Sequence, residues 1–373
     1  MNRTLTTLRV FNHNSTIPRI RSMATSLARH KIVVCTDLGP AAPLLTGRDD
    51  LDVISWTENR SCDRAWLLRN IVGAAGVVVC FQNAVDRELV DAAGPALRVV
   101  STISVGHEHI DLKVMAERNI QVGYTPDILT DAVADSAVML ALMASRRAGQ
   151  SYSFVQNNQW PSFYWTPFAF CGPQLSTTPF SPTRTVGFLG FGRIAHAVLK
   201  RVAAFGITHC IYTPRPGAAD QSVRDVRLRD AHGLVSVAPV DLLTLARESD
   251  VLFVLAPGGA TTRHIVNSEF LRQMRATSVL VNNGRGSVVD SAALARALAD
   301  GWIWGAGLDV VEEEPQVGSD HPLVREPRCV VLPHIGSAAS ETRAEMATLT
   351  ACNVLAGVMG EPLPVAIDYS TIA

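Results

Sequence analysis

Three side chains with complementary chemistry follow apolar runs in the second half of the chain. Arg285 follows "SVLVNNG", Glu314 ends "GLDVVEEE" and His334 follows "CVVLP". An arginine fork matches a carboxylate with two parallel hydrogen bonds, and histidine exchanges protons near neutral pH. A carboxylate beside the imidazole favours the protonated ring, which can act as a general acid. Together the three indicate a site that holds a small carboxylate and protonates a neighbouring atom.

The elements that must position these residues alternate between strands and helices. Apolar runs such as "KIVVC", "GVVVCF" and "ALRVVSTIS" predict buried strands, whereas "DRELVDAAG" and "DLKVMAERN" predict helices. This order predicts an α/β fold with parallel sheets. Residues that follow such strands surround the ligand crevice, so we expect Arg285, Glu314 and His334 to converge there. The glycines flanking Arg285 predict a close approach of its backbone to other groups.

A glycine-rich turn between a predicted strand and a predicted helix indicates a dinucleotide site. In "TVGFLGFGRIAHAVLKRVAAFG", Gly190 permits a tight turn and Gly192 lets the backbone approach a pyrophosphate. Ala195 lets the helix pack closely on the strand. The candidate cofactor-binding residues of this turn are Gly190, Phe191, Gly192, Arg193 and Ile194.

The next predicted strand ends "YTPRPG", without the acid that holds the ribose 2′-hydroxyl in NAD sites. Arg215 and the Thr213 hydroxyl are available there to bind a 2′-phosphate. The pattern favours NADP(H), with NAD(H) as the alternative because Asp220 and Asp225 lie close in sequence. A solvated loop arginine is the other interpretation of Arg215.

Composition excludes several classes of function. The chain of 373 residues has a net charge of −1, which gathers neither nucleic acid nor anionic membrane. No apolar run is long enough to suggest a spanning helix. The seven cysteines show no C-x-x-C spacing, so they predict neither a disulfide framework nor a metal site, and favour a reducing compartment.

Two segments differ from the rest. Residues 1–30 are rich in arginine, serine and threonine, and no acid precedes Asp37. This composition is typical of a mitochondrial transit peptide, the alternative being a disordered basic tail on a cytoplasmic protein. Residues 160–183 are rich in proline and aromatic residues. They either fold back on their own core or, through Trp160, Phe163 and Trp165, dock on a second subunit of a homodimer.

Six motifs in order resemble the D-isomer-specific 2-hydroxyacid dehydrogenases. They are "STISVGHEHIDL", "VGYTPDILTDAVAD", "GFLGFGRIA", "NNGRGSVVD", "GAGLDVVEEEP" and "LPHIGSA". Further text, such as "WTPFAFCG" and "IYTPRP", is most similar to the glyoxylate reductase/hydroxypyruvate reductase branch. The resemblance implies two Rossmann-like domains with parallel sheets. The dinucleotide-binding domain (129–339) would be inserted in a discontinuous flavodoxin-like substrate domain (31–128 plus 340–373).

The resemblance also implies roles for individual residues. Arg285 would bind the carboxylate and polarise the ketone of a small 2-oxo acid, and His334, paired with Glu314, would protonate the developing alkoxide. The backbone N–H groups of Val105 and Gly106 would bind the substrate carboxylate, and Phe81 and Gln82 would line the substrate pocket. Asp309, Thr130 and Pro257 would contact the cofactor. Trp165 would reach the active site of a neighbouring subunit.

The implied reaction is NADPH-dependent reduction of glyoxylate or hydroxypyruvate to the D-2-hydroxy acid. One alternative is a dehydrogenase of the same family that acts on a different or bulkier 2-oxo acid. The other is a dinucleotide-sensing corepressor with the same fold. The chain departs from the family pattern at Glu108, where aspartate is usual, and at Gly258–Gly259, where Leu-Thr is usual. His107 and His109 are interpreted as ordinary loop histidines, and Glu312 and Glu313 as solvated neighbours of Glu314.

Overall fold

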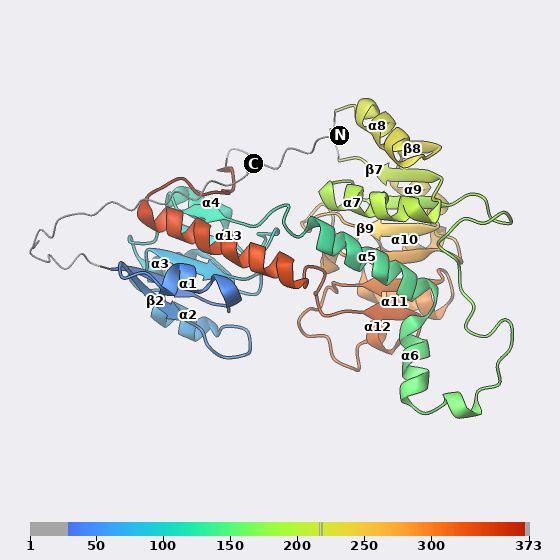
Figure 1. Ribbon diagram of the computed structural model, residues 1–373, viewed down its shortest axis with the longest axis horizontal. Helices are drawn as coiled ribbons and strands as arrows, with labels where there is room; N and C mark the ends of the chain where they lie inside the picture. Colours follow the sequence, from blue (N-terminus) through green and yellow to red (C-terminus); the bar gives the residue numbers. More distant parts are fainter. Residues whose placement is uncertain (1–28, 216, 218, 370–373) are drawn as a thin grey trace, which may run out of the picture.

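Two parallel sheets, each covered by helices, make up the protein (Figure 1). The computed structural model describes residues 29–215, 217 and 219–369. The expectation of a mitochondrial targeting segment falls almost entirely on residues 1–28, which lie outside the described residues. None of the helices within the described ranges is long and apolar enough to cross a membrane. The two sheets confirm the predicted α/β class.

The first sheet has five parallel strands in the order β2-β1-β3-β4-β5. Its strands are β1 (His30–Val34), β2 (Leu51–Ser55), β3 (Gly76–Val79), β4 (Val99–Thr102) and β5 (Gln121–Gly123). Its helices are η1 (Gly39–Ala41), α1 (Pro43–Thr46), α2 (Arg64–Asn70), α3 (Arg87–Ala93) and α4 (Leu112–Glu117). The strands β3 and β4 are buried throughout, because helices cover both faces of the sheet.

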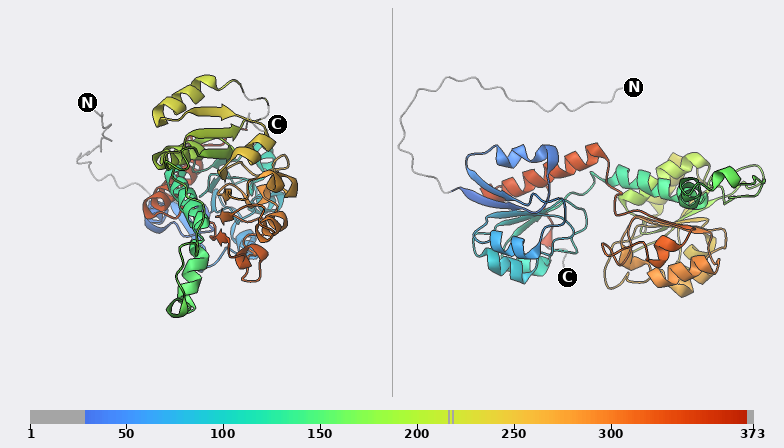
Figure 2. Two further views of the ribbon diagram at one scale, coloured as in Figure 1. Left: turned by 90° about the vertical axis from the view of Figure 1, so that its right-hand side faces the viewer. Right: turned by 90° about the horizontal axis from the view of Figure 1, so that it is seen from below.

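The last long helix of the chain returns to this first sheet. Helix α13 (Ser340–Met359) buries Ala351 and Val354 in the same core as Ile32 of β1 and Val99 of β4. A Cβ on Gly357 would lie 2.5 Å from the Cβ of Val99, so the glycine lets helix and strand approach closely. Both views of Figure 2 place the red helix beside the blue strands, far from it in sequence.

The second sheet has seven parallel strands in the order β12-β11-β10-β9-β6-β7-β8. They are β6 (Thr185–Leu189), β7 (His209–Thr213), β8 (Ser236–Pro239), β9 (Val251–Val254), β10 (Val279–Asn282), β11 (Gly305–Leu308) and β12 (Cys329–Val331). The helices within this series are α7 (Arg193–Val202), η3 (Ala203–Phe205), α8 (Ser222–His232), α9 (Leu242–Glu248), α10 (Ser268–Gln273), η4 (Gly286–Val288), α11 (Ser291–Ala299) and α12 (Pro322–Arg325). The chain order reverses between β6 and β9, which makes their carboxyl ends the switch point where such sheets bind ligands.

An arm leaves the body of the second sheet. Helix α5 (Thr130–Ser145) packs on β10 and β11, and α6 (Ala148–Gln156) with η2 (Trp160–Ser162) extends away from the molecule (Figure 1). Phe163 of the arm packs edge-on against Phe154, with ring centroids 5.4 Å apart. Trp160 and Trp165 remain 64% and 71% exposed. Phe163 therefore packs against aromatic side chains of the arm itself, whereas the two tryptophans face outward.

Candidate active site

Arg285 lies at the tight turn that follows β10. The buried side chain of Asn282 closes this turn, because its amide donates to the Arg285 carbonyl (3.1 Å) and its oxygen accepts from the Gly284 N–H (3.0 Å). A Cβ on Gly284 would lie 2.8 Å from the carbonyl oxygen of Ala256. One on Gly286 would collide with the backbone of Val311. The flanking glycines are thus required by close backbone contacts on both sides, as their spacing predicts.

His334 and Glu314 meet at the ends of β12 and β11. The His334 Nδ1 lies 3.1 Å from the Glu314 Oε1, and both side chains are 29% exposed. With Nδ1 paired to the carboxylate, Nε2 is the nitrogen left for a reacting group. No described residue hydrogen-bonds to it.

Asp309 holds the loop that carries His334. Its carboxylate accepts from the N–H groups of Ile335 (2.7 Å) and Gly336 (2.8 Å), and its carbonyl accepts from the N–H of His334 (2.9 Å). The side chain is only 3% exposed, and this burial raises the pKa of Asp309 above its usual value. In this structure, Asp309 therefore positions the loop of the histidine.

Residues of the first sheet complete the site. The Phe81 ring lies against the His334 ring, with centroids 4.6 Å apart and planes at 31°. Glu108 pairs with Arg285 through two contacts, Nε to Oε1 at 3.1 Å and Nη2 to Oε2 at 3.3 Å. A Cβ on Gly106 would collide with the Arg285 guanidinium, so the loop of Val105 and Gly106 lies directly beside it.

The sequence did not predict the ion pair between Glu108 and Arg285. From the sequence, Glu108 is only a position at which the chain departs from the aspartate usual in the family. Burial tends to raise the pKa of Glu108, but the charge of Arg285 and the hydrogen bonds that the carboxylate accepts together lower the pKa overall. The charged carboxylate thus occupies one edge of the guanidinium. The other edge donates from Nη1 to the Gly284 carbonyl (2.8 Å).

A hydrogen-bonded chain supports the loop of Val105 and Gly106. The Thr102 hydroxyl lies 3.0 Å from Nε2 of His109 and 2.8 Å from the Ser104 hydroxyl, and that hydroxyl donates to the Gly106 carbonyl (2.7 Å). Burial lowers the pKa of His109 to about 4, so the ring is neutral near pH 7. His109 is therefore structural, consistent with its interpretation as a loop histidine.

Gln82 is turned away from Arg285. The Ser61 hydroxyl donates to the Gln82 Oε1 (2.5 Å), and this side chain lines a second pocket described below. The interpretation as a solvated acid is wrong for the partly buried Glu312, whereas Glu313 is exposed, as interpreted. Glu312 contacts Arg263 at 2.7 Å and His264 at 2.6 Å, and Glu313 accepts from the Ser291 hydroxyl at 2.9 Å.

The glycine-rich turn has the shape that a pyrophosphate requires. Gly190 has a φ of +91°, and a Cβ there would lie 2.6 Å from the Ala256 nitrogen. Gly192 is the N-cap of α7, where a Cβ would meet nothing within 4 Å and no side-chain hydrogen bond caps the helix. The first N–H groups of α7 therefore face open space and fit a phosphate. The side chain of Ile194 is partly buried and packs against the core.

The other side chains around the turn are partly engaged within the protein. The Phe191 ring stacks on Tyr212, with centroids 4.3 Å apart. Arg193 pairs with Asp127 at 2.8 Å. Arg224, which sequence reasoning missed, places its guanidinium 5.0 Å from the centre of the Phe191 ring. It adds a cation beside the glycine-rich turn.

The end of β7 carries the residues predicted to select the cofactor. Thr213 is half-buried and Arg215 is exposed, with no ion pair to any described residue. Asp225 is turned inward and 5% exposed, and it accepts from the Tyr212 hydroxyl at 2.7 Å. Asp220 binds the N–H and hydroxyl of Ser222, both at 2.9 Å, at the start of α8. Both nearby acids are thus engaged with α8 and β7.

The region between the glycine-rich turn and Arg285 fits the nicotinamide end of a dinucleotide. Thr130 begins α5, and the exposed Pro257 precedes Gly258, where a Cβ would lie 3.2 Å from the Arg285 side chain. The Asn283 Oδ1 and the Thr125 Oγ1 are buried without a hydrogen-bond partner in the described part of the chain. Such orphaned atoms are costly unless a ligand or water satisfies them.

Comparison with known proteins assigns this arrangement to a family. The model "D-isomer specific 2-hydroxyacid dehydrogenase, NAD binding domain" matches residues 138–336. Human glyoxylate reductase/hydroxypyruvate reductase is 38% identical over 318 residues, which covers 84% of this chain and 90% of the human protein. Glyoxylate reductase of Thermofilum pendens is 36% identical over 353 residues, covering 93% of this chain and 96% of that protein.

Solved structures agree with these matches. A glyoxylate reductase from Paecilomyes thermophila superposes with a TM-score of 0.76 at 26% identity, over 92% of this chain and 99% of that one. An NADPH-dependent glyoxylate/hydroxypyruvate reductase from Sinorhizobium meliloti, in complex with NADP and malonate, gives 0.71 at 31% identity, over 91% and 97%. Together with the glycine-rich turn, these similarities identify the cofactor as a nicotinamide dinucleotide.

Proposed function

Because this chain belongs to the D-isomer-specific 2-hydroxyacid dehydrogenases and is an oxidoreductase of 2-oxo acids, we propose that it reduces glyoxylate or hydroxypyruvate to the D-2-hydroxy acid with NADPH. The proposal is supported by the placement of Arg285 and the His334–Glu314 pair after the adjacent strands β10, β11 and β12, with Gly106 of the first sheet directly beside Arg285. The Phe81 ring, which lies directly against the His334 ring, favours a short substrate beside the histidine.

In this proposal, the first sheet belongs to the domain that binds the substrate and the second sheet to the domain that binds the cofactor. Residues 31–128 plus 340–373 form the substrate domain, supported by the packing of α13 on β1 and β4. Residues 129–339 form the cofactor domain, supported by the switch point between β6 and β9. Substrate then binds between the loops of Phe81 and Gly106 on one side and Arg285 and His334 on the other.

The residues of the chain bind, orient and protonate the substrate. Arg285 holds the carboxylate and directs positive charge at the carbonyl oxygen, while the N–H groups of Val105 and Gly106 bind the other carboxylate oxygen. A bound reduced nicotinamide supplies hydride to the carbonyl carbon. The proton on the His334 Nε2 moves to the carbonyl oxygen as negative charge develops there. Glu314, bonded to Nδ1, stabilises the imidazolium and fixes the ring so that Nε2 faces the substrate.

The residues at the glycine-rich turn would hold the dinucleotide. The N–H groups from Gly190 to Ile194 would bind the pyrophosphate, and Thr130, Pro257 and Asp309 would contact the nicotinamide end. Thr213 and Arg215 would bind the 2′-phosphate of NADPH. This preference is supported by Arg215, which has no ion pair among the described residues, and by the inward orientation of Asp225.

The exposed arm supports a homodimer as part of the proposal. Trp160, Tyr164, Trp165 and Phe168 are each more than 60% exposed on one extended segment, which is unusual for a surface in water. Trp165 would reach the neighbouring subunit's substrate site. Sedimentation of the wild type against Trp165→Ala tests this part. A monomer at working concentration would overturn it.

Initial rates with a panel of 2-oxo acids test the proposed reaction. NADPH and NADH oxidation is measured with glyoxylate, hydroxypyruvate, pyruvate and a bulky aromatic 2-oxo acid. Fast turnover of the first two with NADPH is expected, and Arg285→Ala should lose it. Turnover confined to the bulky acid would overturn the substrate assignment. No turnover, combined with a change in oligomeric state on adding cofactor, would favour a dinucleotide sensor.

A further inference from the structure

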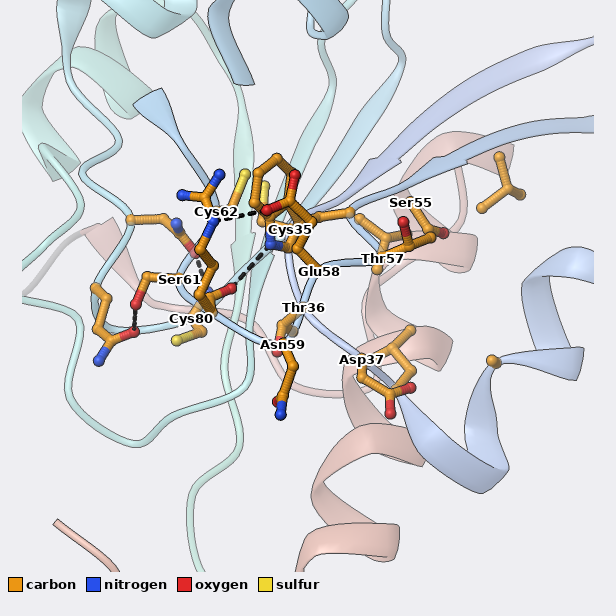
Figure 3. A pocket seen from close by; sticks show the side chains of 18 of the residues that line it. Cys35, Thr36, Asp37, Ser55, Thr57, Glu58, Asn59, Ser61, Cys62 and Cys80 are labelled. Atoms are coloured by element: carbon orange, nitrogen blue, oxygen red, sulfur yellow. Dashed lines mark hydrogen bonds and ion pairs between the residues drawn. The ribbon is translucent and has the colours of Figure 1, made fainter. Parts of the chain in front are cut away.

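A second pocket, of about 710 Å³, opens at the carboxyl ends of β1, β2 and β3, and three cysteines line it (Figure 3). Cys35 follows β1 directly, Cys80 follows β3 directly, and Cys62 lies between β2 and α2. The carboxyl ends of parallel strands meet at one edge of a sheet, which explains why these distant residues meet. Arg285 and His334 do not line this pocket, and the proposed reductase chemistry uses none of the three thiols.

Two of the cysteines face each other. Figure 3 shows the sulfur atoms of Cys35 and Cys62 turned toward one another at the wall of the pocket. Cys35 is buried, whereas Cys62 is partly exposed at the pocket wall. A reagent in the pocket therefore meets Cys62 first, with Cys35 directly behind it.

The two thiols differ in acidity. The hydrogen bond from Cys35 lowers the pKa of Cys62, and the charge of Arg60 acts in the same direction. The same hydrogen bond, with burial, raises the pKa of Cys35. Burial also raises the pKa of Cys80. Among the three, Cys62 is thus the thiol suited to react first, since the thiolate is the reactive form.

The loop of Cys62 is connected to the substrate loop. Ser61, which precedes Cys62, donates to Gln82 at 2.5 Å. Gln82 follows Phe81, whose ring lies against His334. A displacement of Cys62 therefore reaches Phe81 through two peptide units and one hydrogen bond.

We propose that Cys35 and Cys62 form a peroxide-sensitive dithiol that closes to a disulfide and weakens substrate binding. The Cys62 sulfur attacks one oxygen of hydrogen peroxide, the O–O bond breaks, and the second oxygen leaves as water after taking a proton. The Cys35 sulfur then attacks the Cys62 sulfenic acid, forms the S–S bond and releases a second water. Two thiols are oxidised by two electrons, and one peroxide is reduced to two waters.

Peptide mapping of the full-length protein tests the chemistry without relying on the proposed function. After treatment with one equivalent of peroxide and alkylation of the remaining thiols, trypsin should release peptide 32–48 joined to peptide 61–64. Dithiothreitol should separate the two peptides. Oxidation of other cysteines while 32–48 and 61–64 stay alkylated, or a bond from Cys62 to Cys80, would overturn the proposal.

Matched variants identify the two roles. Cys62→Ser should abolish the linked peptide, and Cys35→Ser should leave Cys62 open to further oxidation to the sulfinic acid. Cys171→Ser, at an exposed cysteine on the arm, should leave the linked peptide unchanged. Cys35→Ala and Cys62→Ala serve as second variants if a buried serine impairs folding. Loss of the link in Cys171→Ser would contradict the pairing.

The effect on substrate rests on the proposed function and has its own readout. Oxidation should raise KM for glyoxylate several-fold in the wild type, with recovery on reduction, while NADPH affinity measured by fluorescence stays constant. Cys62→Ser and Cys35→Ser should be insensitive to the same peroxide. An unchanged KM in protein that carries the disulfide would overturn the coupling. If the protein proves not to reduce glyoxylate, peptide mapping alone decides whether Cys35 and Cys62 form the disulfide.

Discussion

Arg285 and Glu108, which lie on loops of different sheets, form an ion pair with two contacts of 3.1 and 3.3 Å. The guanidinium that we assign to the substrate carboxylate is thus already held by a carboxylate of the chain. The pair is partly exposed, with side chains 32% and 48% accessible, so it contributes little to stability. Its consequence concerns binding, because Glu108 competes with an anionic substrate for the same edge of Arg285.

Replacing Glu108 with glutamine should therefore lower KM for glyoxylate. Removing one negative charge several ångströms from the bound carboxylate is worth about 1 kcal/mol in a partly hydrated site, which corresponds to about a fivefold decrease. Initial-rate kinetics at fixed NADPH measure this effect. Glu58→Gln, at an exposed acid paired with Arg60 near the second pocket, is the control and should leave KM unchanged. An increase in KM for Glu108→Gln would mean that the acid serves to position Arg285.

Replacing Glu314 with glutamine should reduce kcat and leave KM nearly unchanged. The charge-assisted bond to His334 Nδ1 becomes a neutral one, and the imidazolium loses about 1.5 to 3 kcal/mol of stabilisation, or about ten- to hundredfold in kcat. Glu313→Gln makes the same substitution at the adjacent residue, which contacts Ser291 and not His334, and serves as the control. Equal losses in both variants would indicate a structural effect on this loop.

Much of the fold follows from sequence because each buried parallel strand is a short apolar run. Arg285, Glu314 and His334 were expected together, since each follows the carboxyl end of a strand. The contacts between the two sheets were not predicted. The Glu108–Arg285 pair and the Phe81–His334 stack join loops of different sheets, and no local pattern encodes how those sheets meet.

The local sequence pattern also failed to predict the surroundings of two acids, Glu312 and Asp225. Glu312 appears as one of three consecutive acids, a composition typical of a solvated loop, yet Arg263 and His264 bind it. Asp225 lies near the predicted ribose site in sequence, but its position on α8 turns it toward the Tyr212 hydroxyl. Helical phase, which depends on where α8 begins, decides such orientations.

Replacing Arg215 with aspartate should reverse the preference for NADPH. The variant loses a charge-assisted bond to the 2′-phosphate and places a carboxylate where it can accept from a ribose 2′-hydroxyl. We expect the ratio of kcat/KM for NADPH to that for NADH to fall by about 10²-fold or more, because each charged hydrogen bond is worth roughly 1.5 to 3 kcal/mol. Arg227→Asp, at an exposed arginine of α8, should leave the ratio within twofold, about ±0.5 kcal/mol. An unchanged ratio in Arg215→Asp would remove Arg215 from the cofactor site.

The buried His109 should make the protein less stable in mild acid. Its pKa in the folded protein is about 4, below the ordinary value of 6.5, so the unfolded chain binds the proton more tightly. The contribution of His109 to the free energy of unfolding is fully present above pH 6.5 and is lost progressively as the pH falls toward 4. The loss is about 3.5 kcal/mol at most, because each tenfold difference in proton affinity between the folded and unfolded chain is worth about 1.4 kcal/mol.

His109→Gln keeps a hydrogen-bonding partner for Thr102 but cannot be protonated. Urea unfolding of both proteins at several pH values should therefore show a flatter dependence on pH for the variant between 6.5 and 4. Near pH 7 the variant should be the less stable of the two, because it fits the Thr102–Ser104 chain less well. Parallel curves for both proteins across this range would show that His109 titrates normally in the folded state.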